Sequence, residues 1–472
     1  MNYHKINILA LLLLLVVACA VPKPATDTTS AVPATFRGDT TPVDMQQESI
    51  ADLPWKSFLT NPELAALIDT ALIKNNDLQI AIKGIEAADE LYKKAKQGYL
   101  PTVGFGVTAS NSLPSKNSLN GLTADQFLHT KSLNDYNASL GISWEADIWG
   151  KVKNRKGEAL AQYLKTLEAR KGIQTILVAA IANGYYNLLM LDQQLLIAKK
   201  NLALNDSTLE MVRLQYASAQ VTSLAVEQQE AQRLATAQLI PKLEQDVSVQ
   251  ENALSVLMGI PPQAIGRSGK LNHLELPATV AAGLPAAMMS RRPDVKSNEL
   301  ELQAASARIG IARANMYPSL TISAQGGIDA LKASNWFNIP ASLFGIVAGS
   351  LMQPIVQKRE LKTQYNVAVI QREQAVLRFR QSILTASQEV ADALVKIDKL
   401  DKQQAIAVVR VDKLQQAATN ANLLFAAGKA NYLEVITAQS RELSGELELA
   451  TVRREQLSAA IDLYRSLGGG WK

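Results

Sequence analysis

The chain has 472 residues, of which 47% are hydrophobic, 19% are charged and 5% are aromatic, with a single cysteine. The apolar fraction excludes a disordered protein, and the scarcity of charged and aromatic residues favours Ala- and Leu-rich helices over a conventional compact core. One cysteine excludes a disulfide framework within the chain and any zinc site built from several cysteines. The net charge of +5 comes without a basic block interleaved with aromatics, so nucleic acid is not expected as a partner.

The N-terminus predicts the compartment. The apolar run over residues 8–18 is shorter than the about 20 residues of a membrane-spanning helix, but it has the length of a signal-peptide core. Val16, Val17 and Ala18 before Cys19 fit a bacterial lipoprotein signal, in which the cysteine becomes the lipidated N-terminus. An ordinary signal with an incidental cysteine would leave the place of the only cysteine unexplained. We expect removal of residues 1–18 and a lipidated tether over residues 19–59.

The sequence repeats itself. Residues 75–103 align with residues 292–320 without a gap, and Tyr216 and Leu224 align with Phe425 and Leu433. Because the order of the elements repeats together with the residues, we interpret the chain as two copies of one unit. The two units are predicted over residues 60–260 and 277–470, joined by a linker over residues 261–276.

Each unit is predicted to contain a helix, two strands and a long helical hairpin. Residues 61–97 and 293–316 lack internal helix breakers apart from single glycines, and each run ends shortly before a proline. Apolar and polar residues then alternate, which predicts strands, and Gly/Asn/Ser-rich stretches over residues 109–134 and 329–341 read as loops. Leucines recurring every seven residues predict coiled-coil helices after each strand pair. The strands are expected near residues 102–110, 137–148, 319–328 and 342–354, and the hairpins over residues 151–258 and 357–467.

The strands have the pattern of membrane β-strands. Each has about ten residues, with one apolar face and one small or polar face, which is typical of strands that cross an outer membrane. Four strands cannot close a barrel, and an open edge in lipid costs several kcal/mol for each unpaired backbone group. Copies must therefore pool their strands, and a conduit favours three copies over two because about 8 strands leave an interior that side chains fill. We expect Gly104, Gly106, Ser139, Ser143 and Glu145 to line the lumen, and Phe105, Ile142, Trp144 and Ile148 to face lipid.

Five motifs occur in order along the mature chain: SWEADIWGK at residues 143–151, RRPDV at 291–295, ANMYPSL at 314–320, QPI at 353–355 and LGGGW at 467–471. This ordered set resembles the TolC-type outer-membrane efflux family, in particular its lipoprotein (NodT) branch serving resistance–nodulation–division pumps. The resemblance implies a mixed α and membrane-β fold, in which a homotrimer forms a 12-stranded outer-membrane β-barrel continuous with a long periplasmic α-helical coiled-coil barrel. It also implies an exit duct whose partners are a periplasmic adaptor and an inner-membrane pump.

The resemblance further implies that the hairpin tips dock onto the adaptor. The alternative is that Tyr216, Leu224, Phe425 and Leu433 only seal the core of each hairpin, and the residues themselves favour neither interpretation. Gly428 suits a hairpin turn that needs a positive φ. The expected docking residues are Arg213, Leu214, Tyr216, Ala219, Leu224, Phe425, Gly428 and Leu433.

Members of the family narrow the periplasmic mouth with an acidic ring just beyond the tip. The matching positions here are Glu434 and Thr437, and the first repeat offers Glu227. Three carboxylates at a constriction would raise one another's pKa values and attract cations. The alternative for Glu434 is a solvated helix face.

No enzymatic motif is found, since HExxH, a phosphate-binding glycine loop and GxSxG are all missing from the sequence. His129 and His273 have no carboxylate or cysteine at ligand spacing, so we expect no enzyme activity, no cofactor and no metal site. The leading interpretation is a passive exit duct for small molecules, in a protein anchored in the outer membrane by lipid and extending into the periplasm. Two alternatives stay open: a duct for type I protein secretion, and a lipid-anchored periplasmic coiled-coil scaffold.

Overall fold

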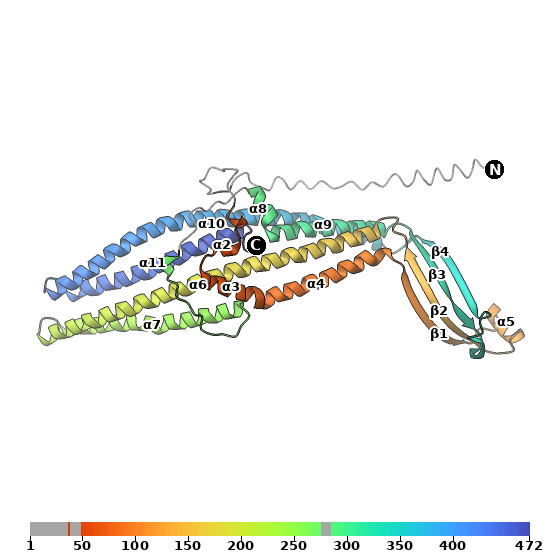
Figure 1. Ribbon diagram of the computed structural model, residues 1–472, viewed down its shortest axis with the longest axis horizontal. Helices are drawn as coiled ribbons and strands as arrows, with labels where there is room; N and C mark the ends of the chain where they lie inside the picture. The colour runs from red at the N-terminus through yellow and green to blue at the C-terminus, as the bar shows by residue number, and fades with distance from the viewer. Residues whose placement is uncertain (1–35, 38–48, 275–284) are drawn as a thin grey trace.

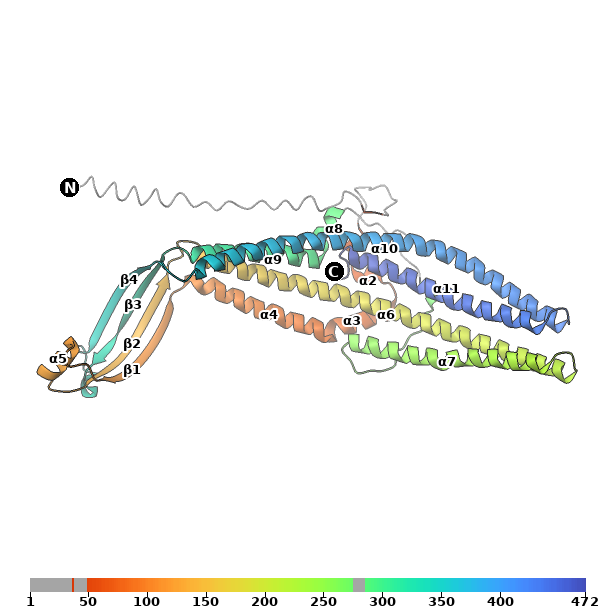
Figure 2. The same ribbon diagram turned by 180° about the vertical axis from the view of Figure 1, so that it is seen from behind.

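The protein is long and narrow, with a four-stranded sheet at one end of a helical bundle and two hairpin tips at the other (Figures 1 and 2). The computed structural model describes residues 36–37, 49–274 and 285–472. The predicted signal peptide, Cys19 and most of the tether lie outside these residues. So do the end of the predicted linker and the first residues of the second unit.

The described chain begins with short elements that pack onto the middle of the bundle. A single helix over residues 61–97 is the wrong prediction, because the chain breaks at Asn75. Asn75 is extended, with ψ 125°, and its side chain accepts a hydrogen bond from the Leu78 backbone N–H at 3.0 Å. It also donates to the Leu257 carbonyl at 2.8 Å, so the break is fixed by a distant helix end. The elements are η2 (Ile50–Asp52), α2 (Trp55–Phe58), α3 (Pro62–Lys74), α4 (Asn76–Lys96) and η3 (Gln97–Tyr99).

The four strands form one antiparallel sheet in the order β1-β2-β3-β4. In this register Ile142 lies between Val103 and Ala324, and Gly141 lies between Gly104 and Gln325. Because neighbouring residues of a strand point to opposite faces, the register of the first three strands collects apolar side chains on one face and small or polar ones on the other. The fourth strand departs from this separation, because its Phe344 and Ile346 pair with Gly327 and Gln325 on the small and polar face. The strands are β1 (Thr102–Ser112), β2 (Leu133–Glu145), β3 (Ser319–Ala330) and β4 (Leu343–Met352).

The second strand ends earlier than predicted, at Glu145, so Ile148 lies beyond the sheet. The Asp147 carboxylate instead accepts hydrogen bonds from the backbone N–H groups of Val152 and Lys153, at 2.8 and 2.9 Å, and so caps the helix that follows. The stretch predicted as the first loop also contains a short helix, α5 (Leu119–Gln126), and the second contains η5 (Ala333–Asn335).

The two long hairpins are structural copies of each other. Their longer helices have 67 residues each and their shorter helices 35 each, and every bound in the second hairpin lies 209 residues after its counterpart. At 1.5 Å per residue the longer helices span roughly 100 Å. The helices are α6 (Lys151–Ala217), α7 (Ser223–Leu257), α10 (Glu360–Ala426) and α11 (Tyr432–Ser466). The segments between the hairpins contain η4 (Leu271–His273), α8 (Pro285–Arg291) and α9 (Pro293–Ala314).

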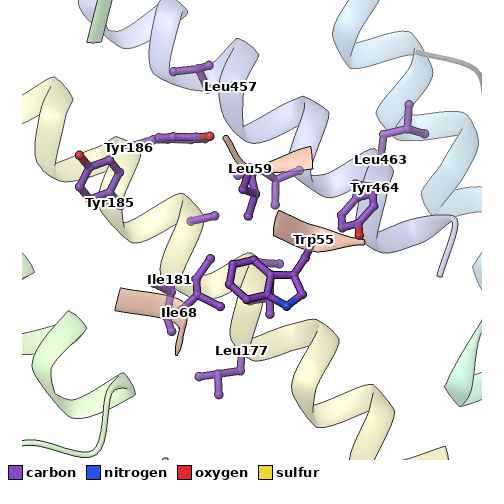
Figure 3. Packing of buried hydrophobic residues seen from close by; sticks show 14 of the residues in the cluster. Trp55, Leu59, Ile68, Leu177, Ile181, Tyr185, Tyr186, Leu457, Leu463 and Tyr464 are labelled. Atoms are coloured by element: carbon purple, nitrogen blue, oxygen red, sulfur yellow. The ribbon is translucent and has the colours of Figure 1, made fainter. Parts of the chain in front are cut away.

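The main hydrophobic core lies midway along the bundle, where the N-terminal elements meet α6 and α11 (Figure 3). Tyr185 and Ile181 of α6 are fully buried there. One window of α6 is long and apolar enough to cross a membrane, but 61% of that window is buried inside the chain, as expected of a core helix. Labelled members of the core in Figure 3 are Trp55, Leu59, Ile68, Leu177, Ile181, Tyr185, Tyr186, Leu457, Leu463 and Tyr464.

The RRPDV motif ties the second unit together. The buried Arg292 guanidinium donates to the Ser466 carbonyl at 2.9 Å and to Glu389 and Asp294 at 2.7 Å each. Ser466 is the last residue of α11, so Arg292 contacts the same place in the second unit that Asn75 contacts in the first. The motif therefore has a structural role.

Candidate functional site

The two hairpin tips turn in the same way. At the first tip, the Ala219 N–H donates to the Tyr216 carbonyl at 2.9 Å and the Gln220 N–H to the Gln215 carbonyl at 2.8 Å. At the second tip, Gly428 and Lys429 make the equivalent bonds. This is a Schellman motif, which needs a left-handed residue directly after the helix cap. Ala219 and Gly428 are that residue, with φ 58° and 71°.

The beginning of α11 is held by a reciprocal pair of side-chain bonds. Asn431 accepts a hydrogen bond from the Glu434 backbone N–H at 3.1 Å and donates to the Glu434 carboxylate at 3.2 Å. The pair is a variant of the capping box, in which the Glu434 carboxylate accepts from the Asn431 side-chain amide instead of from its backbone N–H. The carboxylate also interacts favourably with the positive end of the helix dipole. Thr222, the counterpart of Asn431, makes no such side-chain bond. The Asn-x-x-Glu spacing in the sequence could have predicted this arrangement.

The expected docking residues divide into exposed and buried ones. Phe425 is only 2% exposed and seals the core, as the alternative interpretation has it. The large apolar side chains among the others lie at the surface of the chain, with exposed fractions of 65% for Leu214, 51% for Tyr216, 53% for Leu224 and 54% for Leu433. The remaining three, Arg213, Ala219 and Gly428, are also exposed.

Phe425 belongs to a small core that joins the two tips. Its other buried members are Val212, Ala225 and Val435, so each of the four hairpin helices contributes one residue. One turn further along α11, the buried Gln439 amide donates to Thr208 at 2.8 Å and to Asn422 at 3.1 Å. We call this contact between the two hairpins of one chain the inner seam.

Glu434 and Thr437 lie together on a shallow groove along α10 and α11, with Leu433 and Arg441. The structure thus brings together two of the three predicted gate residues. Glu227 is not brought to this groove, because it lies on α7 at the counterpart position of Ile436. The counterpart of Glu434 in the first hairpin is Ala225. Arg441, seven residues after Glu434 on the same helix face, is a groove residue that the sequence analysis did not single out.

Within the described residues, no group of three or more His, Cys, Asp and Glu side chains is arranged to hold a metal ion. Several carboxylates of the hairpins instead form ion pairs, such as Glu448 with Arg410 at 2.7 Å.

The comparisons with known proteins cover nearly the whole chain. The family model described as "Outer membrane efflux protein" matches residues 67–260 and 284–469. The chain belongs to this family. A curated relative, the probable outer membrane lipoprotein SilC of Salmonella typhimurium, is 27% identical over 90% of this chain and 89% of its own length. The pyoverdine export outer membrane protein OpmQ of Pseudomonas aeruginosa is 28% identical over 100% of this chain and 98% of its own length.

Solved structures of outer-membrane channels share the fold. The crystal structure of CusC has a TM-score of 0.81 and 25% identity, covering 96% of this chain and 100% of its own. The outer-membrane channel OprN has a TM-score of 0.85 and 23% identity, covering 97% of this chain and 99% of its own.

These findings confirm the resemblance, the mixed helical and membrane-strand fold, the efflux role and the outer-membrane location that the sequence predicts. Members of the family are efflux channels and act as trimers together with an adaptor and a resistance–nodulation–division pump. The contacts described above for the SWEADIWGK and RRPDV motifs give two of the five motifs structural roles in this fold.

Proposed function

We propose that three copies of this chain form the exit duct of a tripartite efflux system. The sheet supports this: β1 and β4 are its two edges within one chain, and in lipid their backbone groups need partners. Three sheets joined edge to edge would close a 12-stranded barrel, with the apolar face of each sheet turned to lipid and the small and polar face to the lumen. The same three-fold arrangement would give six hairpins around one axis.

We further propose that Cys19 carries the acyl chains that anchor the mature N-terminus in the outer membrane. Cys19 is the only cysteine, and a relative at 27% identity is named a lipoprotein. The cargo class that we propose is small molecules. The names of relatives support this, since they include pyoverdine export, toluene efflux and solvent efflux. In this account the chain is a conduit without catalysis, and the energy comes from the pump.

The exposed tips are the proposed docking surface for the adaptor's helices. Leu214 and Leu224 are exposed apolar side chains at the end of α6 and the beginning of α7. The turn between these helices lies at the end of the molecule farthest from the sheet (Figure 1), where a periplasmic partner would approach. Ala219 lies in the turn between these two leucines, and Gly428 lies in the turn of the second tip. Phe425 is left out of this surface because it is buried.

The groove residues Glu434 and Thr437 are the proposed gate at the periplasmic mouth. Glu434 is exposed in one copy and lies in the first turn of α11, next to the tip. Three such carboxylates around the axis would hold cations and keep the mouth narrow.

The test is the conductance of purified protein in planar bilayers. We expect Glu434→Ala to raise the closed-state conductance and to weaken block by divalent cations. The matched control is Glu448→Ala, which removes another exposed carboxylate of α11 outside the groove, and which should leave both unchanged. Unchanged conductance and cation block in Glu434→Ala would remove Glu434 from the gate.

A further inference from the structure

Both repeats place cations where the helical bundle meets the sheet. The helices α4 and α9 run into the sheet, and α6 and α10 leave it (Figure 1). Lys96 and Arg313 are equivalent in the repeat and lie in the last turns of α4 and α9. Lys153 and Lys362 are equivalent and lie in the first turns of α6 and α10. Within the described residues, none of these four side chains is in an ion pair.

Helix stability explains only some of these charges. A cation in the last turn of a helix interacts favourably with the helix dipole, and Lys96 and Arg313 have that position. The start of α6 is the opposite end of a dipole, yet its first turn contains Lys151 and Lys153 and no acidic residue. Cations at both kinds of helix end are explained if an anion outside the chain lies at this level of the molecule.

Aromatic side chains mark the same level as a membrane interface. Trp144, the next-to-last residue of β2, donates from its indole Nε1 to the Tyr99 carbonyl at 2.9 Å, and both rings are partly exposed. Tyr99 follows Lys96 by three residues. Trp and Tyr are enriched where a membrane protein passes from lipid to water. Because the helices extend from here into the periplasm, this interface belongs to the periplasmic leaflet of the outer membrane.

Lys153 lies on the lipid side of its helix. The Lys151 ammonium donates to the Glu145 carboxylate at 2.9 Å, and Glu145 belongs to the small and polar face of the sheet. Lys153 is two positions further along α6, about 200° around the helix axis, so it leaves on the side of the apolar face. Lys362 repeats this position, since each of the two lysines follows a left-handed residue with φ 71° by three positions.

A hollow of about 150 Å³ lies beside Arg313, between the end of α9 and the beginning of α6. We call it the Arg313 hollow. Its walls include Ile148, Trp149 and Tyr317. The Trp149 and Tyr317 rings are stacked with their centroids 4.6 Å apart, and the Trp149 Nε1 donates to the Pro318 carbonyl at 2.7 Å, so the aromatic wall is fixed in place. Within the described residues the Arg313 guanidinium has no hydrogen bond, so its donors are available to a ligand.

The Arg313 hollow opens on the lipid side of the sheet. A second hollow is lined by Glu145 and Ser319, which belong to the small and polar face, and it shares Trp149 and Tyr317 with the first. The stacked aromatic pair therefore separates the two hollows. The Arg313 hollow has no residue of the small and polar face in its walls, so it lies on the other side of the pair.

We infer that the Arg313 hollow binds the headgroup of an anionic phospholipid of the periplasmic leaflet. The guanidinium donates to the phosphate, to which its planar fork of donors is well matched. Ile148 and Trp149 contact the glycerol and the first acyl carbons, which a free phosphate lacks. Lys153 and Lys362 attract further anionic headgroups at the same level. This rests on the membrane-spanning sheet of the proposed function and adds a lipid partner to it.

Lipid retention by the purified full-length protein tests this site. Native mass spectrometry in detergent, with phosphatidylglycerol or phosphatidylcholine added, should show more phosphatidylglycerol retained by the unchanged protein. Arg313→Gln should lose most of this preference, and adding Lys153→Gln and Lys362→Gln should bring the two lipids to parity. The matched control is Arg380→Gln, which removes an exposed arginine of α10 roughly 30 Å beyond the start of that helix and should keep the preference.

Two further measurements identify the ligand. Arg313→Lys keeps the charge and should keep most of the preference, which separates loss of the cation from damage to the fold. Inorganic phosphate added at the same concentration as phosphatidylglycerol should not displace the lipid, because it makes no contact with the apolar wall. Displacement by inorganic phosphate would overturn the lipid as the occupant of the hollow.

The same spectra separate this inference from the proposed function. A trimeric mass with equal retention of both lipids, or a preference that Arg313→Gln leaves unchanged, overturns the lipid site and leaves the duct intact. A monomeric mass with a preference that depends on Arg313 supports the lipid site, which lies within one chain, and overturns the trimer.

Discussion

At the scale of single residues, the two tips have the same backbone conformation but a different residue at the position with positive φ. Both use a left-handed residue after the helix cap, but this residue is an alanine in the first tip and a glycine in the second. A Cβ atom disfavours this conformation by roughly 1 to 2 kcal/mol, while glycine adopts it freely. A Cβ added at Gly428 would have no atom within 4 Å, so the backbone alone decides the cost.

Exchanging these residues should therefore shift stability in opposite directions. We expect Ala219→Gly to stabilise the folded protein and Gly428→Ala to destabilise it, each by about 1 kcal/mol. Thermal unfolding in detergent, followed by circular dichroism, should rank Ala219→Gly above the unchanged protein and Gly428→Ala below it. The reverse order would show that the tips are not held in this turn.

The position of the proposed gate residue Glu434 can be found in the sequence, but the packing around it cannot. Glu434 can be located because it and Thr437 match the positions just beyond the hairpin tip where the family has its acidic ring. The burial of Phe425 and the exposure of Tyr216 do not follow from the sequence, because the two positions are equivalent in the repeat, yet Phe425 is 2% exposed and Tyr216 is 51% exposed. Sequence periodicity specifies a helix face but not its partner.

At the scale of elements, α11 contains a charge that its packing disfavours. Glu442 is 8% exposed, and burial raises the pKa of this carboxyl; the nearby Glu446 raises it further, while Lys200 opposes the rise. Because the folded state then binds the proton more tightly than the unfolded state, ionisation of Glu442 destabilises the fold. The protonated Glu442 carboxyl contributes fully to stability below pH 4.5, the ordinary pKa of a glutamate. This contribution is lost as the pH rises through the raised pKa of the folded state.

Replacement of Glu442 by glutamine should remove this penalty. We expect Glu442→Gln to raise the unfolding temperature at pH 7 and to change it little at pH 4, where the carboxyl of the unfolded state is also largely protonated. Unfolding temperatures of both proteins across this range check the sign. Glu448→Gln, which changes an exposed carboxylate of the same helix, is the control and should have a small effect at both pH values. An equal rise in the unfolding temperature of Glu442→Gln at pH 4 and at pH 7 would contradict this explanation.

Most helices and strands were predictable because their periodicity is long and regular. The hairpins lie within a few residues of the predicted ranges, and all four strands were found. The break at Asn75 was missed because it depends on a bond to the Leu257 carbonyl, 182 residues away. The early end of β2 was missed because Asp147, which alternates correctly for a strand, serves α6 as a cap.

At the scale of the whole molecule, the shape explains the composition. The main hydrophobic core occupies only the middle of the long bundle, so the chain requires few aromatic residues. The helices leave large apolar side chains such as Leu214 and Tyr216 exposed in a single chain. The sheet likewise has two free edges. Each of these features is completed by further copies in the proposed trimer.

The most direct test of this account asks what holds the protein in the outer membrane. Cys19→Ala combined with an ordinary cleaved signal peptide removes the proposed lipid anchor and leaves the sheet unchanged. Membrane fractionation should recover this variant in the outer membrane, soluble only in detergent and with heat-modifiable mobility, because a closed barrel of the apolar-faced strands stays in the lipid. Recovery as a soluble periplasmic protein would contradict the account, since the sheet would then not span the membrane.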